Sequence, residues 1–417
     1  MPRTSLFERV RDGELRPQHD PPVSDARPTL GPPPPPQLAR RLEAYRDATA
    51  PLVVARERPL TDASVRLFSN DYLSLDRHPR VTSAIVAALE SSGDSLWMSS
   101  VFFAGDTPHR QLEARLAAFL GTQDVLLTQS GYCANAGLVQ AITGRNTQVY
   151  IDRYAHASLW QGALGAGSRL RRFRHNDVGA LEQRIRAFGP GVVLVDSVYS
   201  QDGSICPLVE LVEVASRGGC LIVVDESHAL GTHGPMGEGL VPQLGLQERV
   251  HVRTASLAKA FITRAGLIAG SRELMTYLKY NSYPAIFSSA LMDHDVAGLE
   301  AVLDLVAVAH DRRSRVRRNT AYLRTGLSQL GFDVSAGRAQ IIALKGGPMR
   351  ETIRLRRALE VQGVFGAGFC EPATPRNDSL LRLSINASLG QAELDRVLGA
   401  CRDVASHTAG GGWSSSS

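Results

Sequence analysis

The chain has 417 residues, more than one domain usually holds, so we expect a large core and at least one smaller unit. Its 43% hydrophobic and 21% charged residues are typical of a soluble globular protein. The net charge of +5 is small for this length and the arginines are scattered, so a nucleic-acid partner is not expected. The N-terminus has no apolar signal region and no run reaches the length of a membrane span, so we expect neither export nor membrane insertion.

The cysteines are odd in number and form no C-x-x-C pair. They are Cys133, Cys206, Cys220, Cys370 and Cys401. This pattern argues against a disulfide framework and against a zinc cluster. We therefore expect a reducing, cytoplasmic location and no metal site.

Residues 1–75 are predicted to be an N-terminal arm and linker. Gly31 is followed by prolines at 32–36, which favour an extended, partly disordered polyproline arm. A helical pattern follows over residues 37–48. Polar residues then interrupt an apolar run at 68–73, which contains Asn70.

Residues 76–289 are predicted to form a large α/β domain. Helical stretches alternate there with short apolar runs rich in β-branched residues, which indicate strands buried on both faces of a mostly parallel sheet. These runs lie at 124–127, 149–151, 192–195 and 221–224.

A smaller α+β domain is predicted over residues 290–407, followed by a flexible tail at 408–417. Its helical patterns lie at about 290–330 and 350–362, and its strand-like runs at 339–344 and 381–385.

A basic run occupies residues 311–318 on one of these helical patterns. Its simplest interpretation is the solvated face of a helix. A contact with a phosphate-bearing substrate or with an acidic carrier protein is the alternative.

The chemistry-bearing residues begin with Asp225 and His228, which follow the buried strand at 221–224. Ligands bind at this edge of an open α/β sheet, although a capping aspartate with a packed histidine explains the segment equally well.

Lys259 stands among small and apolar residues, where a charged amine is costly to bury, so it is exposed, paired or neutralised as an imine. An aldehyde cofactor needs such an amine, an acid for its ring nitrogen and a hydroxyl for its phosphate, and Ser256 supplies the hydroxyl.

Two further segments follow predicted strands. Ser130, Gly131 and Tyr132 open a helix, where free N–H groups form an anion site, or where the serine is only a cap. His156 stands just past the next strand, where its ring either lies on a planar ligand or serves the structure alone.

The ordered set of residues 130–132, His156, residues 225–231 and the Ser256-x-x-Lys259 motif resembles the α-oxoamine synthases. The resemblance spans residues 65–400. Within the family, the sequence motifs are most similar to those of autoinducer synthases of the CqsA/LqsA type. These are fold-type-I enzymes that use pyridoxal 5'-phosphate (PLP) to condense an amino acid with an acyl-coenzyme A thioester. The resemblance implies an α-amino ketone product for signalling or specialised metabolism.

The resemblance also assigns cofactor contacts. Lys259 holds PLP and moves the α-proton, Asp225 keeps the pyridine nitrogen protonated, and His228 bonds the ring hydroxyl. His156 stacks on the ring face of the cofactor, and Ser200 contacts the side that carries the ring hydroxyl. The phosphate is bound by the segment Ser130, Gly131 and Tyr132, by Ser256, and by Ser289 of the partner subunit.

For the substrate, the resemblance implies that Arg382 meets the carboxylate, because its planar fork suits one, and that Asn70 assists. It further implies a homodimer with a shared active site, with acyl-coenzyme A or an acyl carrier protein as acyl donor. One alternative hypothesis is a PLP enzyme that catalyses transamination or elimination. A non-catalytic alternative is a PLP-dependent sensor domain.

The chain departs from the family pattern at residues 95–106, where many members are glycine-rich, while His109 and Glu113 match. Trp97, Phe102 and Phe103 either reshape the donor pocket, line an acyl channel, or are core residues. A second departure, residues 261–264 after the lysine, matches the autoinducer subgroup.

Overall fold

The computed structural model describes residues 34–46, 53–91, 98–103 and 105–408. The chain divides into two compact units, residues 1–48 and 49–417. In the first unit the described part is helix α2 (Pro36–Arg46), which agrees with the helical pattern expected at 37–48. The expected polyproline arm and the tail beyond residue 408 lie outside the described residues.

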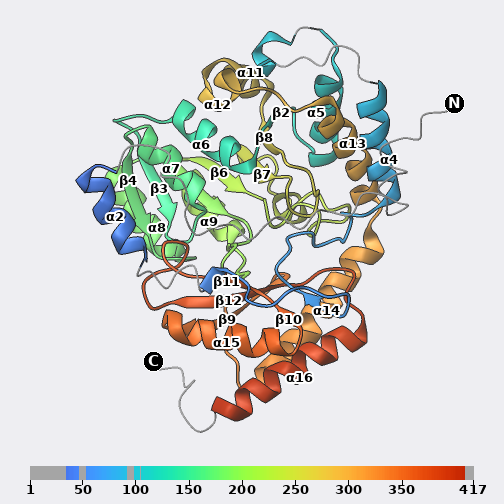
Figure 1. Ribbon diagram of the computed structural model, residues 1–417. Coiled ribbons are helices and arrows are strands. Elements are labelled where there is room, and N and C mark those ends of the chain that lie inside the picture. The colour runs from blue at the N-terminus through green and yellow to red at the C-terminus, as the bar shows by residue number, and fades with distance from the viewer. Residues whose placement is uncertain (1–33, 47–52, 92–97, 104, 409–417) are drawn as a thin grey trace, which may run out of the picture. The chain divides into compact units, whose positions relative to one another are not determined.

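The second unit is built on a mostly parallel sheet with the strand order β2-β8-β7-β6-β5-β3-β4 (Figure 1). In that sheet β8 alone runs antiparallel to its neighbours. The strands are β2 (Asp124–Thr128), β3 (Gln148–Asp152), β4 (Arg169–Phe173), β5 (Val192–Asp196), β6 (Leu221–Asp225), β7 (Val252–Ser256) and β8 (Gly266–Gly270). The α/β class and the predicted parallel sheet are therefore confirmed.

Both faces of this sheet are buried, as the unbroken apolar runs predicted. Val193 and Val195 of β5 pack in one cluster with α8 and α9, while Val192 and Leu194 pack on the opposite face with α6 and α7. The helices of this part are α4 (Pro79–Ser91), η1 (Ser100–Phe102), α5 (Pro108–Leu120), α6 (Gly131–Ile142), α7 (Ala157–Gly165), α8 (Val178–Phe188), α9 (Leu208–Arg217), α10 (Leu240–Gln243), α11 (Arg272–Asn281) and α12 (Tyr283–Phe287).

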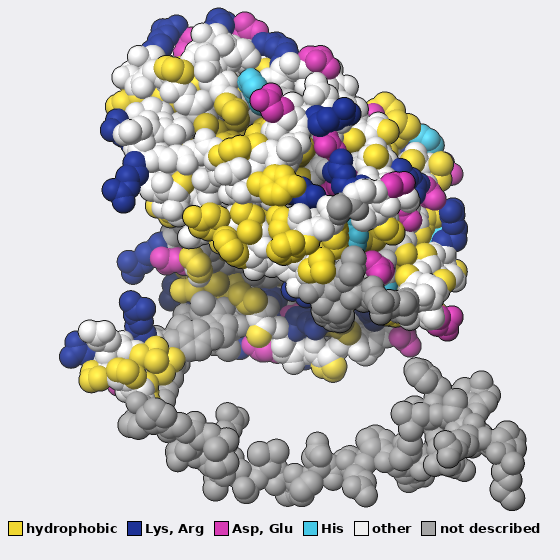
Figure 2. All heavy atoms as spheres, turned by 90° about the horizontal axis from the view of Figure 1, so that it is seen from above, with side chains coloured by type: hydrophobic (Ala, Val, Ile, Leu, Met, Phe, Trp, Pro, Cys, Tyr) yellow, Lys and Arg dark blue, Asp and Glu magenta, His cyan; other side chains and the backbone are white. Residues whose placement is uncertain are grey.

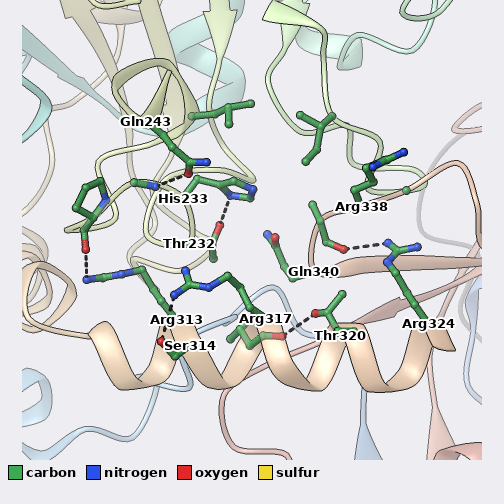
Figure 3. A pocket seen from close by; sticks show the side chains of 18 of the residues that line it. Thr232, His233, Gln243, Arg313, Ser314, Arg317, Thr320, Arg324, Arg338 and Gln340 are labelled. Carbon is green, nitrogen blue, oxygen red and sulfur yellow. Dashed lines mark hydrogen bonds between the residues drawn. The ribbon is translucent and has the colours of Figure 1, made fainter. Parts of the chain in front are cut away.

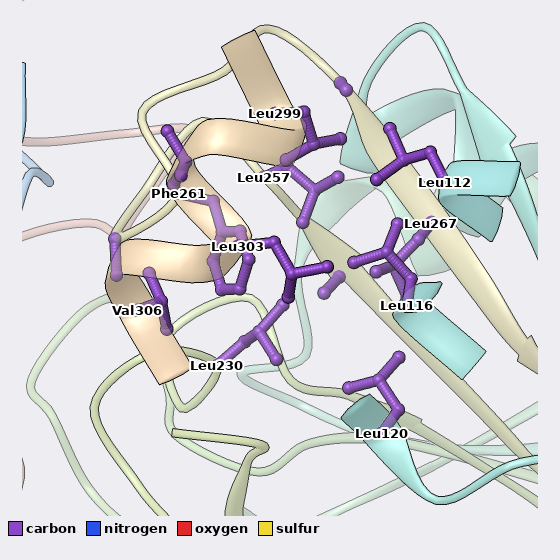
Figure 4. Close-up of a cluster of buried hydrophobic side chains, with 14 of the residues drawn as sticks. Leu112, Leu116, Leu120, Leu230, Leu257, Phe261, Leu267, Leu299, Leu303 and Val306 are labelled. Atoms are coloured by element: carbon purple, nitrogen blue, oxygen red, sulfur yellow. The ribbon is translucent and has the colours of Figure 1, made fainter. Parts of the chain in front are cut away.

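A third apolar cluster joins α5 and α13 (Asp293–Ala307) to the loop around the candidate lysine (Figure 4). Leu112 and Leu116 of α5 and Leu303 of α13 belong to this cluster. Leu257 and Phe261, from either side of Lys259, are buried in it as well. The loop that carries the lysine is thus anchored by close packing on both of its sides.

The C-terminal elements form a second, smaller layer of α+β structure, as predicted. An antiparallel sheet in the order β11-β12-β9 packs with three helices, and a short parallel pair joins β1 to β10. The elements are β1 (Val65–Arg66), α14 (His310–Gln329), β9 (Ile341–Gly347), α15 (Met349–Val361), β10 (Val364–Phe365), β11 (Ala367–Phe369), β12 (Ser379–Ser384) and α16 (Gln391–Thr408). Among the described helices, none has the length and apolarity needed to cross a membrane.

Candidate active site

The carboxyl ends of the parallel strands bring the predicted cofactor residues to one edge of the sheet. Asp225 ends β6 and Ser256 ends β7, and Lys259 follows three residues later. The two strands are hydrogen-bonded in parallel, with Asp225 opposite Thr254. The topology therefore places acid, hydroxyl and amine near each other, as a ligand site at a strand edge requires.

The start of α6 lies against Ser256 with no room for a side chain. A Cβ atom on Gly131 would lie 2.5 Å from the Ser256 Cβ and 2.7 Å from its Cα. Ser130 caps the helix, because its hydroxyl accepts from the Cys133 N–H at 3.1 Å. The first amides of a helix have no intrahelical acceptor, so this turn offers N–H groups beside a serine hydroxyl and suits a phosphate.

The Asp225 carboxylate is buried and held from two sides. One oxygen accepts from the Asn135 amide at 2.6 Å and the other from the Ser227 N–H at 2.8 Å. The Asn135 carbonyl in turn accepts from the Thr254 hydroxyl at 2.5 Å. Asn135 therefore fixes the orientation of the acid, and sequence reasoning assigned it no role although it lies in the segment that follows Gly131.

The amine of Lys259 is largely buried, and its pKa lies below the ordinary value. Burial is the main cause, the positive charge of Arg382 adds to it, and the Asp225 carboxylate opposes both. A lysine with a lowered pKa holds more of its amine neutral near pH 7, and the neutral amine is the form that attacks a carbonyl.

His228 is neutral and has a defined partner. Burial, followed by the charges of Lys259 and Arg382, lowers its pKa well below the ordinary value. Its Nδ1 is hydrogen-bonded to the Tyr72 hydroxyl at 2.7 Å, and burial raises the pKa of Tyr72 to about 12, so the tyrosine keeps its proton. This bond fixes the plane of the imidazole and leaves Nε2 for a second partner.

His156 begins α7 and is fixed by its own helix. Its Nδ1 lies 2.7 Å from the Ser158 hydroxyl, and its backbone N–H donates to Asp196 at 3.1 Å. Burial lowers the pKa of His156, which keeps the ring neutral near pH 7. The ring of Tyr132 meets it edge-on at 6.5 Å, so both lie at the same edge of the sheet.

The predicted substrate residues meet in one hydrogen-bonded group. The Arg382 guanidinium donates to the Asn70 side-chain carbonyl at 2.9 Å and to the Ser200 backbone carbonyl at 2.8 Å. It also lies over the Phe369 ring at 4.6 Å. Its Nε is buried without a partner among the described residues. The arginine thus retains donor capacity and an uncompensated charge for an anionic group.

Other predicted residues are not joined to this group within one chain. Ser289 is exposed, and its backbone carbonyl accepts from Gln129 at 2.6 Å, so its assignment to the partner's site stays a prediction. Phe102 is 72% exposed, which contradicts the core interpretation for this residue, and Phe103 packs against the His109 ring at 4.8 Å. Trp97 lies outside the described residues.

The comparisons with known proteins agree with this geometry. The chain matches the family aminotransferase class I and II over residues 63–400. It is 43% identical over 355 residues to the CAI-1 autoinducer synthase of Vibrio campbellii, covering 85% of this chain and 90% of that protein. It is 38% identical over 371 residues to an 8-amino-7-oxononanoate synthase of Anaeromyxobacter dehalogenans, covering 88% and 92%. A variant of serine palmitoyltransferase from S. paucimobilis, solved with bound PLP and myriocin, has a TM-score of 0.82 at 26% identity and covers 90% of this chain and 98% of its own.

A mostly parallel sheet of this order, with Lys259 just past β7 and Asp225 at the end of the adjacent β6, defines a fold-type-I PLP-dependent transferase. The family match and the two synthases narrow this further. The chain belongs to the aminotransferase class I and II family and, within it, to the α-oxoamine synthases, which are PLP-dependent acyltransferases. The residues present fit PLP: the close approach of Gly131 to Ser256 leaves a cradle of N–H groups for the phosphate, and the amine of Lys259 has a lowered pKa.

Proposed function

We propose that this enzyme condenses an amino acid with a fatty acyl thioester to give an α-amino ketone. A carbon–carbon bond forms between the α-carbon and the acyl carbonyl carbon, the carbon–sulfur bond breaks, and the thiolate leaves and takes a proton. The donor carboxylate departs as carbon dioxide and a proton replaces it. The observation that carries the proposal is the Arg382 group beside Lys259, because an arginine with a free donor is suited to a substrate carboxylate.

When bound, PLP supplies an electron sink for the charge that develops at the α-carbon. Asp225 would face the ring nitrogen of bound PLP, and the Asn135 amide holds that carboxylate in position. Lys259 would hold the cofactor, and its amine would accept the α-proton and return it. The bond to Tyr72 fixes the His228 ring, which would contact the cofactor through Nε2. Arg382 and Asn70, which are hydrogen-bonded to each other, would bind the carboxylate of the amino acid.

We further propose that the active enzyme is a homodimer. Large apolar side chains are exposed on α11, α12 and η1, with Tyr283 67%, Phe287 77%, Tyr280 58% and Phe102 72% exposed. Figure 2 looks onto this side of the second unit and shows hydrophobic side chains gathered there. A patch of this kind marks a protein interface, and Ser289 lies just beyond α12, where a second copy brings it to the neighbouring site.

The test is release of free thiol by the purified enzyme from acyl-coenzyme A thioesters of graded length, with a panel of amino acids and products identified by mass. Thiol release that requires an amino acid and yields an α-amino ketone is expected, with a long-chain optimum as in an autoinducer-type synthase. An acyl carrier protein thioester is assayed in parallel. Amino-group transfer to a keto acid without thiol release would instead establish an aminotransferase and refute the proposal.

A further inference from the structure

A large basic pocket lies between α14 and the loops at 232–235 and 337–340 (Figure 3). Its volume is about 960 Å³, which is in the range of sites for small organic ligands. Among the described residues that line it there is no aspartate or glutamate. Its basic lining residues are Arg313, Arg317, Arg324, Arg338, His233 and His310.

Two of these arginines are fixed charges without a carboxylate partner among the described residues. Arg313 is 2% exposed and donates to the backbone carbonyls of Val306 at 2.6 Å and Pro235 at 2.9 Å. Arg324 donates to the carbonyl of Ala339 at 2.9 Å, and burial lowers its pKa to about 10. Carbonyl groups accept from both side chains, and the Arg324 Nε is buried without a partner among the described residues. Burial lowers the pKa of both arginines, and the charges of Glu238 near Arg313 and of Asp202 near Arg324 oppose it. Because Arg313 is buried, the expected solvated face is wrong for this residue.

The other two arginines have donors to spare. Arg317 is exposed and donates to the Ser314 hydroxyl at 3.1 Å, and Arg338 is exposed and takes part in no ion pair among the described residues. Both line the pocket, Arg317 from α14 and Arg338 from the loop before β9 (Figure 3). Each offers a planar guanidinium fork, a group that recognises phosphate or carboxylate oxygens.

The charges extend along the pocket and repel one another. Arg313, Arg317 and Arg324 lie on one face of α14, and eleven residues of helix span about 16 Å. A single inorganic phosphate is too small to meet a row of that length. Burial and then the charge of Arg317 lower the pKa of His233 to about 4. A bound anion with separated charges relieves this repulsion.

We propose that this pocket binds a small molecule carrying two or more phosphate groups, at a site distinct from the catalytic one. None of the cofactor and substrate residues named above lines it. The backbone of His228 separates the two sites: the Gln340 amide donates to the His228 carbonyl at 2.7 Å, and the Thr232 hydroxyl lies 3.2 Å from it. An occupant of the pocket therefore contacts Gln340 and Thr232, which hold the histidine segment in place.

The test is isothermal titration calorimetry of adenosine 5'-triphosphate into the PLP-loaded enzyme in the presence of a chelator, so that the catalytic phosphate cradle is already filled. Saturable binding is expected for the wild type and for Arg318→Gln, a matched charge removal on α14 outside the pocket lining. The double variant Arg317→Gln/Arg338→Gln is expected to bind about 100-fold more weakly, at about tenfold for each charge-assisted contact.

Two results would overturn the proposal: no saturable binding to the wild type, or equal affinity in the double variant. Circular dichroism checks that the variants fold, and Arg338→Gln alone, expected to weaken binding about tenfold, replaces the double variant if that one unfolds. Coenzyme A distinguishes two sources of this chemistry. Displacement of the triphosphate by coenzyme A indicates the nucleotide half of an acyl donor, and binding without displacement indicates a separate phosphorylated ligand.

Discussion

A methyl group at Gly131 tests whether the start of α6 must lie directly against Ser256. The new Cβ would lie 2.5, 2.7 and 2.9 Å from the Cβ, Cα and N of Ser256. Two of these three atoms are backbone, so no side-chain rotation relieves the contact. Such overpacking costs about 1–3 kcal/mol. Any relief must move α6 away from β7, which widens the N–H cradle and weakens the hold on a phosphate.

The assay has two parts. Urea unfolding of the apoenzyme, followed by circular dichroism, is expected to show that Gly131→Ala loses about 1–3 kcal/mol of unfolding free energy. Titration with PLP, followed by its absorbance, is expected to show weaker cofactor binding. The matched control is Gly399→Ala within α16, where a Cβ meets open space and should gain about 0.5–1 kcal/mol. Wild-type unfolding energy and PLP affinity in Gly131→Ala would refute the proposed cradle.

The remaining predictions concern charge and assembly. Arg382→Gln removes a positive charge that lowers the Lys259 pKa. The apoenzyme should then react more slowly with PLP near pH 7, with its rate profile moved to higher pH; an unmoved profile would show that the two groups are not coupled. His233 has a pKa of about 4 against an ordinary 6.5, so only the unfolded chain takes up its proton between these values. Stability therefore falls as pH drops through that window, by up to about 3 kcal/mol, and urea unfolding of His233→Asn should show a shallower fall. Phe287→Glu places a charge on a side chain that is 77% exposed in one chain and should yield folded monomers in analytical ultracentrifugation; dimers of unchanged stability would place the interface elsewhere.

Much of the fold was predictable because buried parallel strands leave a local signal. Runs such as the one at 192–195 have no polar alternation, and the structure places their side chains in clusters on both faces of the sheet. The placement of Asp225 and Lys259 at one edge was predictable for a related reason, since Asp225 ends β6, Lys259 lies three residues past β7, and parallel strands end at one edge.

The partners of these residues were not predictable from local pattern. Asn135 reaches Asp225 across 90 residues of sequence, and Tyr72 reaches His228 across 156. Nothing in the neighbourhood of either polar residue distinguishes it from a cap or a turn residue. The solvated-face interpretation of the basic run holds for the exposed Arg315, Arg317 and Arg318 but is wrong for Arg313. Its burial depends on the carbonyl group of Pro235 in a distant loop, which local pattern does not show.

Lys259→Ala tests the central claim most directly. The wild-type enzyme and the variant are each given an acyl-coenzyme A and an amino acid, and free thiol and product mass are measured together. The wild type is expected to release thiol in proportion to an α-amino ketone. The variant is expected to make neither while keeping the wild-type circular dichroism spectrum, because it lacks the amine that we propose to hold the cofactor and to move the α-proton. Sustained turnover by the folded variant would contradict the account.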